Sequence, residues 1–101
     1  MSETAVRLVG PGELKLVGVL DYRTGPQLRK QGAALIRSGD LETLTLDCSG
    51  VEKSSSVGLA LLLVFMRDAS EAGKSLKVQC LPEDMREIAQ VSGLNELLDI
   101  H

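Results

Sequence analysis

The chain has 101 residues, of which 44% are hydrophobic and 25% charged, a composition that fits one domain (residues 1–101) with a modest core. Its net charge is −3 and its only aromatic residues are Tyr22 and Phe65, so it lacks the basic stripe and stacking residues of nucleic-acid-binding modules. The apolar run at residues 57–66 is too short to span a membrane, and the first residues lack a signal-peptide pattern. We therefore expect a cytoplasmic protein with no direct membrane insertion.

Four runs rich in apolar residues predict β-strands. The runs AVRLV (residues 5–9) and ELKLVG (residues 13–18) flank a Gly-Pro-Gly turn signal and predict a hairpin. The runs TLTLDC (residues 43–48) and SLKVQC (residues 75–80) alternate apolar with polar residues. Strands buried on both faces would be apolar throughout, so this alternation predicts helices on one face of the sheet and solvent on the other.

A first helix is predicted after Asp21. Thr24 and Gln27 have the spacing of a capping box, with a proline in the first turn, and Gly39 is a C-terminal stop signal. Pairs of carboxylates near strand ends, such as Asp21 and Asp47, usually cap or brace loops. We therefore expect Asp21 to cap this helix or to brace the serine loop, or otherwise to contribute directly to a partner surface.

Two further helices complete the pattern. The second begins at the serines of residues 54–56 and stops at Gly73, and the third covers residues 82–93. An amphipathic tail, residues 94–100, packs either on the domain's own core or on a second copy. The order β-β-α-β-α-β-α predicts an α/β fold with a mixed sheet of four to five strands, parallel where the second helix joins two strands. The expected placement of helices on one face of the sheet only weighs against a doubly wound nucleotide-binding fold.

The two cysteines, Cys48 and Cys80, each end an alternating run at an apolar position. This placement predicts two buried free thiols. Without a partner pair of histidines, the cysteines predict no zinc site, and nothing in the sequence indicates another metal or a cofactor.

The second helix has an unusual distribution of apolar residues. On a helical wheel, its predicted core face is formed by Gly58, Leu62, Phe65, Met66 and Ala69. The far side of the second half is polar, with Arg67, Asp68, Ser70 and Glu71. The far side of the first half is apolar, with Val57, Ala60, Leu63 and Val64. Either neighbouring helices or another protein must cover this apolar side.

The serine triplet offers a cap and a chemical switch. One serine oxygen is sufficient to accept a hydrogen bond from a free amide of the first helical turn. A phosphate on a serine at this end would be stabilised by the amides and the helix dipole. It would also place negative charge beside the apolar surface and weaken a docking contact there.

Two stretches of the sequence carry a resemblance to the STAS domain, the family named for sulfate transporters and anti-sigma factor antagonists. GVLDYRTGPQL (residues 18–28) resembles the family's Gly-x-Leu-Asp entry to the first helix. TLTLDCSGVEKSSSVGLALLL (residues 43–63) resembles its strand, turn and Asp-Ser/Thr-x-Gly loop before the second helix. Ser56 matches the position phosphorylated in anti-sigma antagonists, whereas Ser55 stands where those proteins usually have Asp.

Within the family, the VGLALLL run and the short chain most resemble the STAS subunit of the bacterial Mla phospholipid transporter. The resemblance implies a non-enzymatic subunit, peripheral to the inner membrane through its partner, which binds the ATPase of an ABC transporter in a complex with a membrane permease. Its role would be to support the assembly or activity that maintains outer-membrane lipid asymmetry. The predicted partner-binding residues are Ser54, Ser55, Ser56, Val57, Ala60, Leu63, Val64, Asp21, Tyr22 and Arg29.

A second interpretation is an anti-sigma factor antagonist that is switched by phosphorylation of Ser56 and binds an anti-sigma kinase only when unmodified. An enzyme is the third. It is disfavoured because the only histidine is His101, at the chain end, and because no Gly-x-Ser-x-Gly elbow or P-loop is present. We therefore predict no catalytic residues.

Overall fold

The computed structural model describes residues 4–94, which form four strands and three helices in the predicted order. In chain order the elements are β1 (Ala5–Gly10), β2 (Glu13–Leu20), α1 (Gly25–Arg37), β3 (Thr43–Ser54), α2 (Ser56–Glu71), β4 (Ser75–Gln79) and α3 (Glu83–Val91). The predicted tail at residues 94–100 lies, apart from Leu94, outside the described residues.

The described strands form one mixed sheet in the order β1-β2-β3-β4. The hairpin strands β1 and β2 are antiparallel, whereas β2 pairs parallel with β3 and β3 pairs parallel with β4. In this register Leu14, Leu46 and Val78 form one buried row across three strands. The mixed sheet and the parallel pair joined by α2 confirm the sequence prediction.

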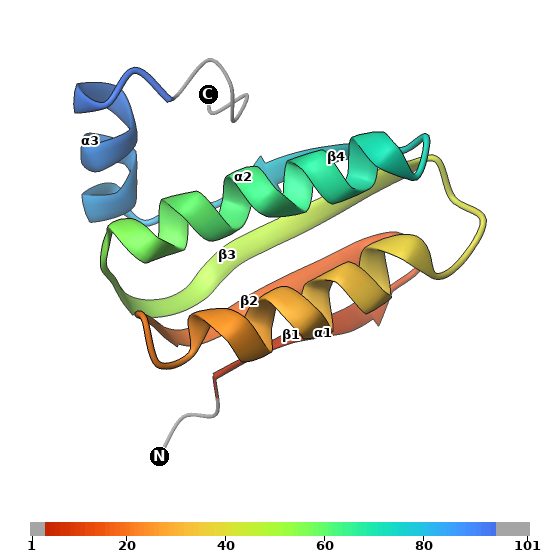
Figure 1. The fold of residues 1–101 in the computed structure, drawn as a ribbon, viewed down its shortest axis with the longest axis horizontal. Helices are drawn as coiled ribbons and strands as arrows, with labels where there is room; N and C mark the ends of the chain where they lie inside the picture. Colours follow the sequence, from red (N-terminus) through yellow and green to blue (C-terminus); the bar gives the residue numbers. More distant parts are fainter. Residues whose placement is uncertain (1–3, 95–101) are drawn as a thin grey trace.

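Helices cover one face of the sheet, as predicted. Figure 1 shows α1 and α2 side by side over that face, with α3 beside the start of α2. Burial alternates along β3, where Leu44, Leu46 and Cys48 are buried while Thr43 is exposed. The strand continues past the predicted residue 48 to Ser54, because it pairs with the whole second half of β2.

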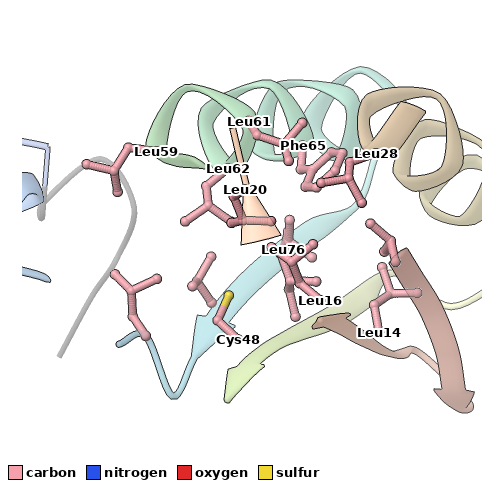
Figure 2. Close-up of a cluster of buried hydrophobic side chains, with 14 of the residues drawn as sticks. Leu14, Leu16, Leu20, Leu28, Cys48, Leu59, Leu61, Leu62, Phe65 and Leu76 are labelled. Carbon is pink, nitrogen blue, oxygen red and sulfur yellow. The ribbon is translucent and has the colours of Figure 1, made fainter. Parts of the chain in front are cut away.

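The core lies between the two helices and the sheet. Figure 2 shows Phe65 and Leu62 of α2 and Leu28 of α1 on one side of this layer, with Leu16 and Leu76 of the sheet on the other. All five side chains are buried. Gly32 of α1 permits this packing, because a Cβ atom there would clash with the ring of Phe65. The first two helices therefore approach closely enough to share one core.

The helix ends follow the sequence signals with one exception. Gly73, with a φ of 73°, follows the C-cap Ala72 of α2, as expected for a glycine stop. The predicted capping box of α1 is wrong. The Thr24 side chain makes no cap hydrogen bond, and its hydroxyl instead donates to the carbonyl of Val19 at 2.8 Å.

Two predicted burials are also wrong. Cys80 is exposed, because β4 ends at Gln79 and the next residue adopts a left-handed backbone with a φ of 56°, which breaks the alternation. Asp68, predicted on the solvent side of α2, is buried, because it lies two turns after Leu61 and faces α1. There its Oδ1 lies 3.8 Å from Nη2 of Arg37.

No helix within residues 4–94 has the length and apolar character that crossing a membrane requires.

Candidate functional site: the hollow between the first two helices

The two loops singled out in the sequence meet at one edge of the sheet. Leu20, the last residue of β2, pairs with Ser54 at the end of β3. The amide of Ser55 donates to the carbonyl of Leu20 at 3.0 Å. Because parallel strands end at the same edge, the loops that lead into α1 and α2 are neighbours. The starts of both helices therefore border one surface.

Each serine of the triplet has a different position. Ser54 ends β3, and its hydroxyl donates to the carbonyl of Ser55 at 2.8 Å. Ser55 is the N-cap of α2, and its Oγ accepts from the amide of Val57 at 3.2 Å. Ser56 is the first residue of the helix and is exposed. Only Ser55 performs the capping expected of the triplet, which leaves the hydroxyl of Ser56 accessible.

The loop before α1 is held by Asp21. Its Oδ1 accepts from the amides of Arg23 and Thr24, at 2.8 and 3.1 Å. The hydroxyl of Thr24 in turn accepts from the amide of Asp21 at 3.0 Å. The carboxylate therefore supports the entry to α1, one of the roles that the sequence allowed, and both of these hydrogen bonds lie within its own loop.

An open hollow of about 370 Å³ lies between α1 and α2, and we call it the α1–α2 hollow. Its walls are Tyr22, Gly25, Pro26 and Arg29 on the α1 side and Val57, Ala60, Leu61 and Val64 on the α2 side. At their N-terminal ends the two walls are close together, because a Cβ atom on Gly25 would lie 3.3 Å from Cγ1 of Val57. The lining is largely apolar, with Tyr22 76% exposed at its edge.

The hollow unites five of the predicted partner-binding residues and leaves others out. It brings Tyr22 and Arg29, on the α1 side, against Val57, Ala60 and Val64, on the α2 side. From the sequence, these two groups could be assigned only to separate parts of the chain. The serines and Asp21 lie in the two loops that lead into its walls. Leu63 is half-buried against the hydrophobic core and does not line the hollow. It lies roughly a third of a turn round the helix from the lining residues.

Three lining residues were missed by the sequence analysis: Gly25, Pro26 and Leu61. Pro26 had been assigned only to helix initiation, Gly25 had not been singled out, and Leu61 was not placed on either face. For Leu61 a signal was available in the helical spacing. Leu61 follows Val57 by four residues and therefore shares its face.

Two titratable groups differ from their ordinary behaviour, and both lie on β3. Burial raises the pKa of the Cys48 thiol to about 12. A hydrogen bond from the amide of Ser49 holds the pKa of the Asp47 carboxyl below its usual value, at a donor–acceptor distance of 2.8 Å. Neither residue lines the α1–α2 hollow. Among residues 4–94, no group of three or more His, Cys, Asp and Glu side chains is placed to hold a metal ion.

The chain is similar in fold to two solved structures. One is described as the anti-sigma factor antagonist SpoIIAA in its unphosphorylated form, with a TM-score of 0.70, 22% identity, and coverage of 90% of this chain and 81% of that one. The other is the Bacillus cell fate determinant SpoIIAA in the phosphorylated form, with a TM-score of 0.64, 24% identity, and coverage of 90% and 84%. At these identities the likeness concerns the fold.

A family model described as "Mlab, STAS domain" matches residues 5–99, nearly the whole chain. The match spans the hairpin, both helices that border the α1–α2 hollow, and the serine loop between β3 and α2. Together with the mixed sheet and its helices on one face, this match shows that the chain belongs to the STAS domain family.

Proposed function

We propose that this protein is a non-enzymatic subunit that binds the ATPase of an ABC-type phospholipid transporter through the α1–α2 hollow. Through that ATPase it would join a complex with a membrane permease and support its assembly or activity. The system it serves would maintain outer-membrane lipid asymmetry. The protein would reside in the cytoplasm, held at the inner membrane by its partner.

The observation that carries this proposal is the apolar lining of the hollow beside the serine loop. Val57, Ala60 and Val64 remain only half-buried or exposed although the helix continues into a fully packed core. Apolar surface that stays open next to a functional loop is typical of a protein-binding site. The Mla description of the matching family model supports a transporter ATPase as the partner.

The loop chemistry supports the same choice. Ser55 occupies the N-cap, where family members with a phosphorylation switch usually have Asp. Its hydroxyl caps the helix without adding a carboxylate to the loop. The alternative is phosphorylation of the exposed Ser56, with an anti-sigma kinase as the partner. One experiment distinguishes the transporter subunit from this phosphorylation switch.

The experiment is isolation of the tagged protein from its native cells, followed by mass spectrometry of the partners and of Ser56. We expect the ATPase and permease of an ABC transporter, with Ser56 unmodified. Val57→Asp should abolish this capture while the domain stays folded, because an acid in the first helical turn is favourable for α2 itself. A folded variant that captures the ATPase as well as the wild type does would remove the hollow from the proposal.

The matched control is Val91→Asp. Val91, on α3, is 90% exposed and lies away from the hollow, so the same change there should leave capture intact. Recovery of a kinase-like anti-sigma factor together with phosphorylated Ser56 would instead establish the switching role and overturn the transporter proposal.

A further inference from the structure

The charges around the α1–α2 hollow are distributed unevenly. The whole chain has a net charge of −3. In contrast, residues 21–37, the segment that contains the α1 side of the hollow, carry four basic residues and one acid, a local net charge of +3. The basic residues are Arg23, Arg29, Lys30 and Arg37. The hollow is therefore bordered by a locally positive segment of an acidic protein.

Some of these positive charges already have a neighbour within the chain. Arg37 lies 3.8 Å from the buried carboxylate of Asp68. The guanidinium of Arg23 lies over the ring of Tyr22, 5.8 Å from its centre. Arg29 and Lys30 are exposed, and within residues 4–94 neither forms an ion pair. Arg29 lines the hollow and Lys30 is the next residue along α1, so both cations remain available to a partner that lies there.

The opposite wall carries no charge at its N-terminal end. Residues 56–66 of α2 contain no acidic or basic side chain. Asp68, the first charged group that faces α1, is buried farther along the helix. A partner segment in the hollow would therefore meet apolar side chains on the α2 side and positive charge on the α1 side.

The secondary structure of the two walls limits which secondary structure a partner segment can have in the hollow. Both are α-helices whose backbone groups are bonded internally, so the hollow offers no sheet edge for an added strand. Recognition must use side chains, as when an amphipathic helix lies in a groove. A second copy of this chain is a poor occupant, because a two-fold contact through the hollow would bring two positive walls together.

Building on the proposed function, we infer that the partner segment is an amphipathic helix with an acidic flank. Its apolar side chains would lie in the hollow against Val57, Ala60 and Val64, and its carboxylates would lie beside Arg29 and Lys30. The charge pairs would fix the orientation of the helix, since an opposite orientation would place the carboxylates against the uncharged wall.

The test uses two synthetic helical peptides and the full chain, with no ATPase present. Each peptide is about 15 residues long, because shorter helices are marginal in water. Both carry leucines at positions i, i+4 and i+7, and one has glutamates on the flank where the other has lysines. The methyl NMR signals of Val57, Ala60 and Val64 report binding at the hollow.

We expect the acidic peptide to shift these signals and to bind on the order of tenfold more tightly than the basic one, since two exposed ion pairs each contribute up to about fivefold. The double variant Arg29→Glu, Lys30→Glu should reverse the preference. Lys77→Glu, on β4, should leave it unchanged. Equal binding of the two peptides, binding of neither, or shifts that depend on protein concentration alone would overturn the inference.

These outcomes are independent of the identity of the partner. Capture of the ATPase with no peptide preference would leave the proposed function intact and refute the acidic helix. A clear preference for the acidic peptide without capture of an ATPase would support the acidic helix and refute the proposed function.

Discussion

Ser55 and Ser56 are neighbours in the sequence but contribute differently to the start of α2. The hydroxyl of Ser55 accepts a hydrogen bond from the amide of Val57 and lies 3.5 Å from the carbonyl of Leu20. Ser56 is exposed. Ser55 therefore stabilises the loop, whereas a change at Ser56 alters only the surface.

We predict that Ser55→Ala lowers the free energy of unfolding by about 1 kcal/mol, because α2 loses its N-cap. Ser55→Asp should retain most of the stability, since Asp caps about as well as Ser. Urea denaturation of both variants measures the effect. Ser56→Ala is the control and should change stability by less than about 0.5 kcal/mol. A loss at Ser56 as large as that at Ser55 would contradict the assignment of the cap.

At the scale of elements, the C-terminal end of α1 is held by a residue from a distant loop. The ammonium of Lys74, between α2 and β4, donates to the carbonyls of Ile36, Ser38 and Gly39 at 2.7, 2.9 and 3.1 Å. The last carbonyls of a helix have no partner within it and carry the negative end of its dipole. Lys74 therefore satisfies two such acceptors, those of Ile36 and Ser38, together with the carbonyl of Gly39 just past the helix, and ties the end of α1 to the turn after α2.

We predict that Lys74→Met lowers the free energy of unfolding by about 1–2 kcal/mol. The carbonyls lose their hydrogen-bond donor, and the negative end of the helix dipole loses a neighbouring cation. Chemical denaturation gives the value, and hydrogen exchange should show faster opening of the last turn of α1. Lys77→Met serves as the comparison, since this exposed lysine lies on β4 and has no part in the contact. Equal losses in the two variants would show that the three hydrogen bonds add nothing.

At the scale of the whole molecule, all described elements contribute to one hydrophobic core. Cys48 lies within it with no exposed surface, whereas Cys80 is exposed. Ionisation of Cys48 would place an unpaired charge in the core, which is why burial raises the pKa of this thiol from its usual 9.0 to about 12. The stability of the whole domain is therefore linked to the protonation of this thiol.

We predict a loss of stability as the pH rises through the interval between these two values. Above pH 9.0 the thiol of the unfolded chain ionises while the folded state keeps its proton up to about pH 12. Stability from this group is therefore fully present below pH 9.0 and should fall by about 2 kcal/mol by roughly pH 10.5, 1.5 pH units higher, at about 1.4 kcal/mol per unit.

The measurement is urea denaturation of the wild type and of Cys48→Val at several pH values. The variant has no thiol in the core, so its loss of stability at high pH should be smaller than that of the wild type by the amount attributed to Cys48. The other titrating groups act equally on both proteins. Parallel pH profiles would contradict the prediction.

Much of the fold was predictable because its signals are local. Alternation along β3 and β4 reveals which face is buried, the Gly-Pro-Gly turn marks the hairpin, and Gly73 marks the end of α2. These patterns depend on the backbone geometry of a few consecutive residues. The order of elements then restricts the sheet to a mixed topology.

Tertiary structure decided what depends on residues distant in the chain. The sequence indicated Tyr22, Arg29 and Val57 separately, but only the packing of α1 on α2 placed them around one hollow. Thr24 forms a hydrogen bond with Val19 in place of its expected cap, and Asp68 turns towards Arg37. A local pattern gives the direction of a side chain along its own element, whereas its neighbour across the molecule is set by how the elements pack.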